Sequence, residues 1–196
     1  MEKGALTELG TATRILDIAE RLVQVRGFNG FSYSDVSSEL KITKAALHYH
    51  FASKADLGVS LIERYSTRFG DARADIDTQS TDALFKLRSY ASLYAQTLRE
   101  RRMCLCGMMA AEYATLSPSM QAAVNRYFAD NQQWLLEVLD QGRTAGALTF
   151  DGSPSEVASM ILGGLEGAML IAWPTGDVAG FESCAKHLLK NLVPQQ

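Results

Sequence analysis

The sequence is poor in proline and cysteine and has no long uninterrupted apolar run. It contains 4 prolines and 3 cysteines in 196 residues. Three cysteines are too few for a disulfide framework and fit a reducing compartment. The longest apolar stretch, residues 160–173, is interrupted by Glu166 and is shorter than the roughly 20 residues that cross a bilayer. Residues 1–10 lack the basic and apolar regions of a secretory signal, so we expect a soluble cytoplasmic protein with no membrane partner.

Motifs of common enzyme classes are missing as well. The sequence has no nucleotide-binding glycine loop, no nucleophile elbow and no HExxH zinc motif. His48 and His50 are two residues apart, as are Cys104 and Cys106, and side chains with that spacing point to different faces of a helix. We therefore expect no enzymatic activity, no metal site and no cofactor.

The composition favours helices. Apolar residues make up 47 % of the chain, enough to bury a sizeable core. Helix-forming alanine and leucine are abundant, and no run of alternating β-branched residues is present. The sequence therefore predicts an all-α fold.

The charge distribution gives only local support for a nucleic-acid partner. The formal net charge is −3, and residues 1–60 carry 7 basic and 7 acidic side chains. Lys41, Lys44 and Lys54, however, gather with two histidines around one short segment. Any attraction to an anionic polymer would therefore depend on this segment rather than on the whole chain.

The spacing of apolar residues and the helix-capping residues predict where the helices lie. Gly27 is placed to end the first helix and Ser32 to begin the second. The strongest helix start is residues 153–156, Ser-Pro-Ser-Glu, which combine an N-cap, a proline in the first turn and a capping glutamate. The polar residues 77–81 are predicted to form a loop. The predicted helices are 11–26, 32–40, 44–50, 54–75, 82–101, 118–145, 154–172 and 177–192.

Residues 40–54, LKITKAALHYHFASK, are interpreted as the second half of a helix-turn-helix. The first three residues form a tight turn, Thr43 is an N-cap, and residues 44–50 form a short helix. A helix of this length is not stable alone, so its apolar side must rest on the two preceding helices. Two helices, a tight turn and a third helix form the arrangement expected of a small DNA-binding unit.

The outward residues of this segment are cationic, aromatic or small, which suits the surface of a duplex. Lys44, Tyr49 and Lys54 are predicted to meet phosphates, whereas Thr43 and Ala45 are placed nearer to base edges. The alternative is an incidental helical hairpin without DNA binding. The predicted DNA contacts are Ser32, Ser34, Thr43, Lys44, Ala45, His48, Tyr49, His50 and Lys54.

These residues resemble the TetR family of bacterial transcriptional regulators. The resemblance lies in Arg26-Gly27-Phe28, Asp35-Val36 and above all residues 42–57, which follow the family pattern S-K-x-x-L-Y-x-H-F-x-S-K-x-x-L closely. Two positions depart from it. His48 stands where tyrosine is usual, and Lys41 stands where the turn commonly has glycine, which would strain Lys41 if the turn requires a positive φ.

The resemblance implies a helix-turn-helix domain over residues 1–53 and a helical ligand-binding and dimerisation domain over residues 54–196. It also implies a homodimer formed by the last two helices and a small-molecule effector bound among the middle ones. Small residues in the predicted helix 154–172 agree with a close helix–helix approach across a dimer, and close packing within one subunit is the alternative. The predicted interface residues are Gly163, Gly164, Gly167 and Ala168.

Aromatic residues, methionines and isolated glutamates in the apolar segments are candidates for the effector site, with an ordinary core position as the alternative. Glu112 and Glu166 are the polar residues embedded in the most apolar stretches. The predicted ligand contacts are Phe85, Tyr94, Met108, Glu112, Tyr113, Trp134 and Glu166.

The expected function is that of a ligand-responsive repressor, which binds a palindromic double-stranded operator as a dimer and is released by a small molecule. One alternative is a thiol-based regulator that senses oxidants or electrophiles through Cys104 or Cys106, near Arg101 and Arg102. Buried cysteines acting as small apolar residues are the plainer interpretation. A second alternative is a helical interaction protein that has lost DNA binding.

Overall fold

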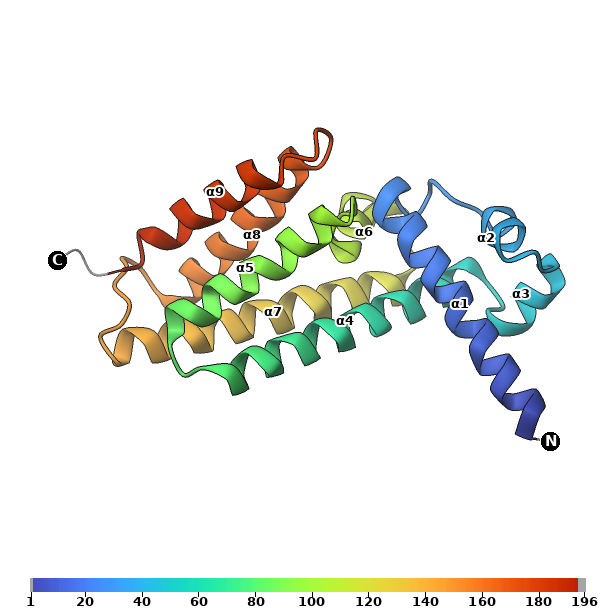
Figure 1. Ribbon diagram of the computed structural model, residues 1–196, viewed down its shortest axis with the longest axis horizontal. Coiled ribbons are helices and arrows are strands. Elements are labelled where there is room, and N and C mark those ends of the chain that lie inside the picture. Colours follow the sequence, from blue (N-terminus) through green and yellow to red (C-terminus); the bar gives the residue numbers. More distant parts are fainter. Residues whose placement is uncertain (1, 194–196) are drawn as a thin grey trace. The chain divides into compact units, whose positions relative to one another are not determined.

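The computed structural model describes residues 2–193, with side chains from residue 10 onward, and the regular secondary structure in this range is helical. The ends of the predicted domains, residues 1 and 194–196, lie outside the described residues. The absence of strands from residues 2–193 confirms the all-α expectation. In chain order the helices are α1 (Glu2–Arg26), α2 (Tyr33–Leu40), α3 (Lys44–His50), α4 (Lys54–Gln79), α5 (Ala83–Arg99), α6 (Leu105–Ala111), a short 3₁₀ helix (Tyr113–Thr115), α7 (Pro118–Thr144), α8 (Pro154–Ala172) and α9 (Val178–Lys190) (Figure 1).

The helices form two compact units that are not continuous in sequence. The first unit comprises Met1–Ser66 and Leu105–Asn125, and the second comprises Thr67–Cys104 and Arg126–Gln196. The units therefore differ from the predicted division between residues 53 and 54. The physical reason is that α6 packs against α1 and joins the first unit, although it lies far from α1 in sequence.

The core of the first unit is built from the apolar faces of its short helices. Ile15 and Val23 of α1, Val36 of α2 and Leu47 of α3 are each fully buried. Gly27 ends α1 with a φ of 83°, as its position after the last apolar residue predicted. The three helices thus share one apolar centre, and none buries its apolar face by itself.

Charged side chains fix the direction of α1 against its neighbours in the first unit. Arg64 of α4 donates to Asp17 at 2.7 Å and to Glu20 at 2.8 Å on α1. Arg21 of α1 forms an ion pair with Glu39 of α2 at 2.5 Å. Because Glu20 is almost fully buried, its pairing with Arg64 is needed to offset the cost of burying a charge.

The second unit is organised around aromatic rings contributed by α4, α5 and α7. The Phe69 ring meets the rings of Tyr90, Tyr94 and Tyr127 edge to face, with centroids 5.6–5.8 Å apart. This geometry is the favoured one for aromatic pairs, because ring edges are positive and ring faces negative. Helices α8 and α9 lie side by side over this core, and α9 also packs along α5 (Figure 1).

The predicted loop at residues 77–81 is mostly wrong, because α4 continues to Gln79. Asp77 accepts a hydrogen bond from Trp134 Nε1 at 2.8 Å and forms an ion pair with Lys86 at 2.6 Å. These tertiary contacts hold the last turn of α4, which local apolar spacing alone could not predict.

Helix α8 is long and apolar enough to cross a membrane when judged by length and composition, and it is the one such helix in the described part of the chain. The core helices of globular proteins pass the same test. In the single chain, 39 % of the tested window is buried. The part of α8 that is not buried includes the exposed apolar side chains of Met160, Leu170 and Ile171.

Lys41 occupies the left-handed region, with φ 57° and ψ 40°, at the end of α2. A side chain with a Cβ is strained there, whereas glycine is not. We therefore expect Lys41→Gly to be about 1 kcal/mol more stable than Lys41→Ala, which shares the loss of charge but keeps the Cβ. Urea unfolding of both variants measures the difference, and equal stability would contradict the strain at this position.

Candidate nucleic-acid interface and regulatory core

Helix α3 is positioned by one cap and one buried side chain. Thr43 Oγ1 accepts a hydrogen bond from the backbone N–H of Ala46 at 3.1 Å, which confirms Thr43 as the N-cap. Leu47 is fully buried, and Phe51, at the end of the helix, is nearly so. Tyr33 of α2 donates to the Phe51 carbonyl at 3.0 Å. Both ends of this seven-residue helix are therefore held by neighbouring segments.

The opposite side of α3 is open to solvent. Lys44, Ala45, His48 and Tyr49 are exposed, and 73 % of the Tyr49 surface is accessible. His50 is half-buried and lies against the Tyr49 ring. A large aromatic side chain this exposed has no role in the core of its own unit. It is available to another surface.

His48 is oriented although it is exposed. Its Nδ1 lies 3.0 Å from the carbonyl of Ala52, so Nδ1 carries the proton that is donated. Its ring also lies against Tyr33, with centroids 4.8 Å apart. Nε2 has no hydrogen bond to any described residue and remains able to make one with an outside group.

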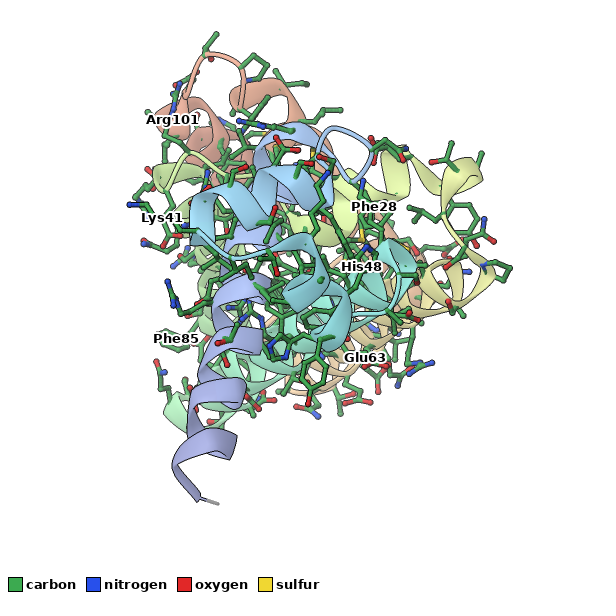
Figure 2. The ribbon with its side chains drawn as sticks, turned by 90° about the vertical axis from the view of Figure 1, so that its right-hand side faces the viewer. Phe28, Lys41, His48, Glu63, Phe85 and Arg101 are labelled. Carbon is green, nitrogen blue, oxygen red and sulfur yellow. The ribbon has the colours of Figure 1, made fainter. Side chains whose placement is uncertain are left out.

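The outer residues of α2 and α3 line one shallow hollow of about 420 Å³, which includes five of the predicted DNA contacts. Figure 2 shows His48 on α3 and Lys41 at the end of α2 on the same side of this unit. The structure thus brings together residues that are up to 22 positions apart in sequence. The predicted contacts that line the hollow are Ser32, Ser34, Lys44, His48 and Lys54.

The sequence suggested that Lys54 is free to contact a phosphate, but its side chain is bound within the first unit. Its Nζ donates to the backbone carbonyls of Phe28 and Phe31, at 2.5 Å each, and lies over both rings. Burial lowers the pKa of Lys54 from its ordinary value, and the carboxylates of Glu112 and Asp35 oppose this effect. Lys54 therefore holds the connection between α1 and α2 in place, and its contact with DNA stays a prediction.

Ser32 is also engaged within the unit. Its hydroxyl donates to the Asp35 carboxylate at 2.6 Å, and its backbone N–H donates to the same oxygen at 2.7 Å. The hydroxyl bond first, and then the backbone bond, lower the pKa of Asp35 below its ordinary value. This is the capping pair expected from the sequence.

Glu112, between α6 and the 3₁₀ helix, contacts the same connection. Its carboxylate accepts the backbone N–H of Asn29, at 3.1 and 3.4 Å, and Thr115 accepts the Asn29 side chain at 2.8 Å. A Cβ at Gly27 would lie 2.7 Å from Glu112 Oε1, so only glycine permits this approach. Asn29 and Gly27 were not singled out as contacts of Glu112, because residues 83 positions apart leave no local signal.

The predicted ligand contacts belong to both compact units. Met108, Glu112 and Tyr113 belong to the first unit, where the Tyr113 hydroxyl accepts from Asn125 at 2.8 Å. Phe85 lies in the second unit but is 40 % exposed at the start of α5. The remaining three, Tyr94, Trp134 and Glu166, lie in the second unit, and Tyr94 and Glu166 are in contact.

A buried polar cluster, the tyrosine–carboxyl cluster, lies in the second unit. The Tyr90 hydroxyl is 3.2 Å from the Tyr94 hydroxyl and donates to Asn131 Oδ1 at 3.1 Å. Trp134 stacks on the Tyr90 ring. Tyr90, Tyr127 and Asn131 were not among the predicted site residues, and Asn131, a single polar residue in α7, resembles any other surface position. Its members are Tyr90, Tyr94, Cys104, Tyr127, Asn131 and Glu166.

Glu166 is the charged member of this cluster. Burial raises its pKa, hydrogen bonds from Cys104 and Tyr94 oppose the rise, and the resulting value is about 7. Its Oε1 atom is buried and has no hydrogen-bond partner among the described residues. A buried carboxyl oxygen without a donor is costly, and such groups are frequent at functional sites.

Arg101 and Arg102, the two cations of the thiol hypothesis, contact other residues. Cys104 and Cys106 are both buried, and the Cys104 sulfur lies 3.8 Å from the Tyr127 hydroxyl. Arg102 forms an ion pair with Glu100, and Arg101 lies against Gly176. The charged neighbour of Cys104 is instead the Glu166 carboxyl. Among the described side chains, no group of three or more metal-ligating residues is found.

The small residues of α8 divide into two kinds. A Cβ built on Gly163 or Gly167 meets no described atom within 4 Å, whereas one on Gly164 would touch Leu188 of α9 at 3.0 Å. Gly164 therefore serves close packing within the chain. Contacts within the described part of one subunit do not explain why residues 163 and 167 are glycine. Ala168 is half-buried beside them.

The raised pKa of Glu166 makes stability depend on pH. Since the folded state holds this proton more tightly than the unfolded chain, whose ordinary value is 4.5, the stabilisation is fully present below pH 4.5. It is lost as the pH rises to about 7. Between these limits we expect wild type to lose roughly 3 kcal/mol of unfolding free energy relative to Glu166→Gln. Urea unfolding at fixed protein concentration measures this difference. Parallel curves of unfolding free energy against pH for wild type and Glu166→Gln would contradict it. The control variant Glu137→Gln, at an exposed position, should follow wild type.

Two family models match separate parts of the chain. Residues 15–60 match the N-terminal model of the bacterial regulatory proteins of the tetR family. Residues 81–188, more than half of the chain, match the model of the tetracyclin repressor-like C-terminal domain. The first match covers α2 and α3, and the second covers the tyrosine–carboxyl cluster.

Relatives and solved structures agree over nearly the whole length. The HTH-type transcriptional repressor NemR of Escherichia coli is 28 % identical over 95 % of this chain and 96 % of its own. A TetR-family regulator from Agrobacterium tumefaciens superposes with a TM-score of 0.93 and 29 % identity, covering 95 % of this chain and 100 % of that one. A TetR regulator from Legionella pneumophila superposes with a TM-score of 0.83 and 30 % identity, covering 91 % of this chain and 95 % of that one.

These relatives are transcriptional regulators, not enzymes. The matched models together account for both compact units, and the helix-turn-helix that α2 and α3 form lies within the first match. The chain belongs to the TetR family of bacterial regulatory proteins.

Proposed function

We propose that this protein is a ligand-responsive repressor that binds a palindromic DNA operator as a homodimer and is released by a small molecule. The observation that carries the proposal is the exposed side of α3, where Lys44, Ala45, His48 and Tyr49 face outward while Leu47 anchors the helix. In this proposal residues 1–53 bind DNA and residues 54–196 bind the effector and the second subunit. The relatives are transcriptional regulators, which supports the proposed DNA binding and a cytoplasmic location.

The residue types on this surface support contact with the DNA backbone and with base edges. Lys44 and Tyr49 are the phosphate contacts, since a cation and a hydroxyl both pair with phosphate oxygens. The methyl side chain of Ala45 is too small to keep the helix away from the floor of the DNA groove. His48 offers Nε2, because Nδ1 is already bound to Ala52. Lys54 acts mainly by holding the connection that positions α2.

The exposed face of α8 supports a dimer formed through α8 and α9. Met160, Leu170 and Ile171 are 50 %, 61 % and 80 % exposed, an unusual amount of apolar surface for one helix of a soluble domain. Gly163 and Gly167 lie on the same helix and leave room for a second backbone. A symmetric copy packed on this face would cover the apolar side chains and use the glycines.

The tyrosine–carboxyl cluster is the proposed place of effector recognition. Tyr94 and Glu166 are predicted contacts that the structure brings together, and the unpartnered Oε1 of Glu166 is a free acceptor for a donor group on a ligand. A ligand that supplies this hydrogen bond would favour the conformation that it fits and shift the dimer away from the DNA-bound form.

Lys44→Ala and Tyr49→Ala should each weaken DNA binding about five- to tenfold across sequences, since phosphate contacts carry no base information. Fluorescence titration with duplex fragments from the gene's own upstream region, at two salt concentrations, measures this. Lys44→Ala should also reduce the salt dependence by about one phosphate contact.

Arg126→Ala serves as the control for these variants, because Arg126 is an exposed cation of the second unit. It should bind as wild type does. Unchanged affinity in both α3 variants would show that α3 is not the DNA-binding helix. No binding by wild type at either salt concentration would favour the interaction protein that has lost DNA binding.

Thiol sensing is a second candidate, favoured by the hydrogen bond between Cys104 and the Glu166 carboxyl. With a pKa of about 7, this carboxyl is partly ionised at neutral pH and is placed to accept the thiol proton when sulfur attacks an electrophile. One solved neighbour is the reduced form of E. coli NemR, 26 % identical with a TM-score of 0.80.

The thiol candidate is tested with iodoacetamide in a Cys184→Ser background, because Cys184 is exposed and would react first. The candidate predicts that treatment abolishes DNA binding, that adding Cys104→Ser preserves binding, and that adding Cys106→Ser does not. Loss of binding in all three proteins would contradict the candidate, because Cys104 would then not be required for the response.

A further inference from the structure

A groove of about 850 Å³ runs between α5 and α9 and is separate from the tyrosine–carboxyl cluster and from the exposed face of α8. Both helices belong to the second unit. The volume falls within the range of small-molecule sites. The predicted effector contacts do not line it, and nothing in the proposed function uses it.

The groove exists because the facing side chains in its middle are small. Ala91 and Ala95 of α5 face Ala185 of α9, and larger apolar residues, Phe181 and Leu189, lie on either side of Ala185. The three alanines are buried yet leave a channel between the helices. The resulting floor is apolar.

The two ends of the groove differ in charge. Helices α5 and α9 run antiparallel, as Figure 1 shows, and Arg99 at the end of α5 pairs with Glu182 near the start of α9. That ion pair neutralises the one carboxylate lining the groove. At the other end, Arg88 lies with Lys190.

Three cations therefore line the groove without compensation. The side chains of Arg88, Lys186 and Lys190 form no ion pair or hydrogen bond with any described residue, and all three are exposed. Arg88 and Ala95 are two turns apart on α5, which places the cationic end about 10 Å from the apolar end. Lys186 follows Ala185 in the middle of α9, so the cations that lie at one end are Arg88 and Lys190. An apolar channel with two cations at one end matches a molecule with an apolar chain and an anionic head.

We propose that the groove between α5 and α9 binds single-chain amphipathic anions, with the apolar chain along Ala91, Ala95 and Ala185 and the anionic head between Arg88 and Lys190. The inference goes beyond the proposed function, since it concerns a site outside the effector core and assigns no effect on DNA binding. The exposed apolar residues of α8, Met160, Leu170 and Ile171, do not line the groove.

The probe is decanoate, used as a monomer and measured by isothermal titration calorimetry with the full-length protein. Decan-1-ol has the same chain without the charge and should bind about tenfold more weakly. The Arg88→Gln/Lys186→Gln/Lys190→Gln variant should weaken decanoate about tenfold and leave decan-1-ol unchanged. Arg126→Gln controls for the loss of a cation elsewhere in the same unit.

Ser92→Trp tests the groove independently of charge. Ser92 lines the groove and is exposed, so a large ring there fills the channel without disturbing the core. It should abolish binding of both probes, and Gln133→Trp, an exposed position on α7, should not. Circular dichroism confirms that each variant keeps its helices.

Three results would overturn the proposal. They are no binding of decanoate to wild type, equal binding of decanoate and decan-1-ol, and binding unaffected by Ser92→Trp. Binding to phosphatidylglycerol vesicles without binding of monomeric decanoate would also overturn it, because the surface would then be a membrane contact. Charge-dependent binding that Ser92→Trp abolishes would support it.

Discussion

The packing of Leu47 beneath α3 is the interaction on which the proposed function depends. A helix of seven residues does not fold by itself, so its orientation is set wholly by what holds it. Leu47 supplies the apolar anchor, Thr43 supplies the cap, and the Phe51 carbonyl ties the far end to Tyr33. The exposed side chains of α3 keep a fixed direction only because the first unit fixes the buried one.

The second unit contains the opposite situation, a polar group held inside an apolar environment. Glu166 accepts hydrogen bonds from Tyr94 and Cys104, and its Oε1 atom has no donor among the described residues. Such an arrangement reduces stability when the group ionises. In the proposed function, a change in ligand occupancy at Glu166 would shift the conformation of this core.

The sequence predicted the elements that depend on local chemistry. The caps at Ser32, Thr43 and Ser153 are found where expected, and the positive φ anticipated for Lys41 is observed. Contacts between distant segments were not predictable. Glu112 was expected to meet a ligand but holds Asn29, and the seven predicted ligand residues are divided between two units. Periodicity identifies buried faces, and it does not identify their partners.

The central claim is that two copies of α3 read two half-sites of one operator. Hydroxyl-radical footprinting on the gene's own upstream region tests it most directly. The account predicts two protected patches on the same face of the duplex, with centres about 34 Å apart, one helical turn. A single protected patch, or two patches on opposite faces, would contradict a symmetric dimer that presents α3 to successive major grooves.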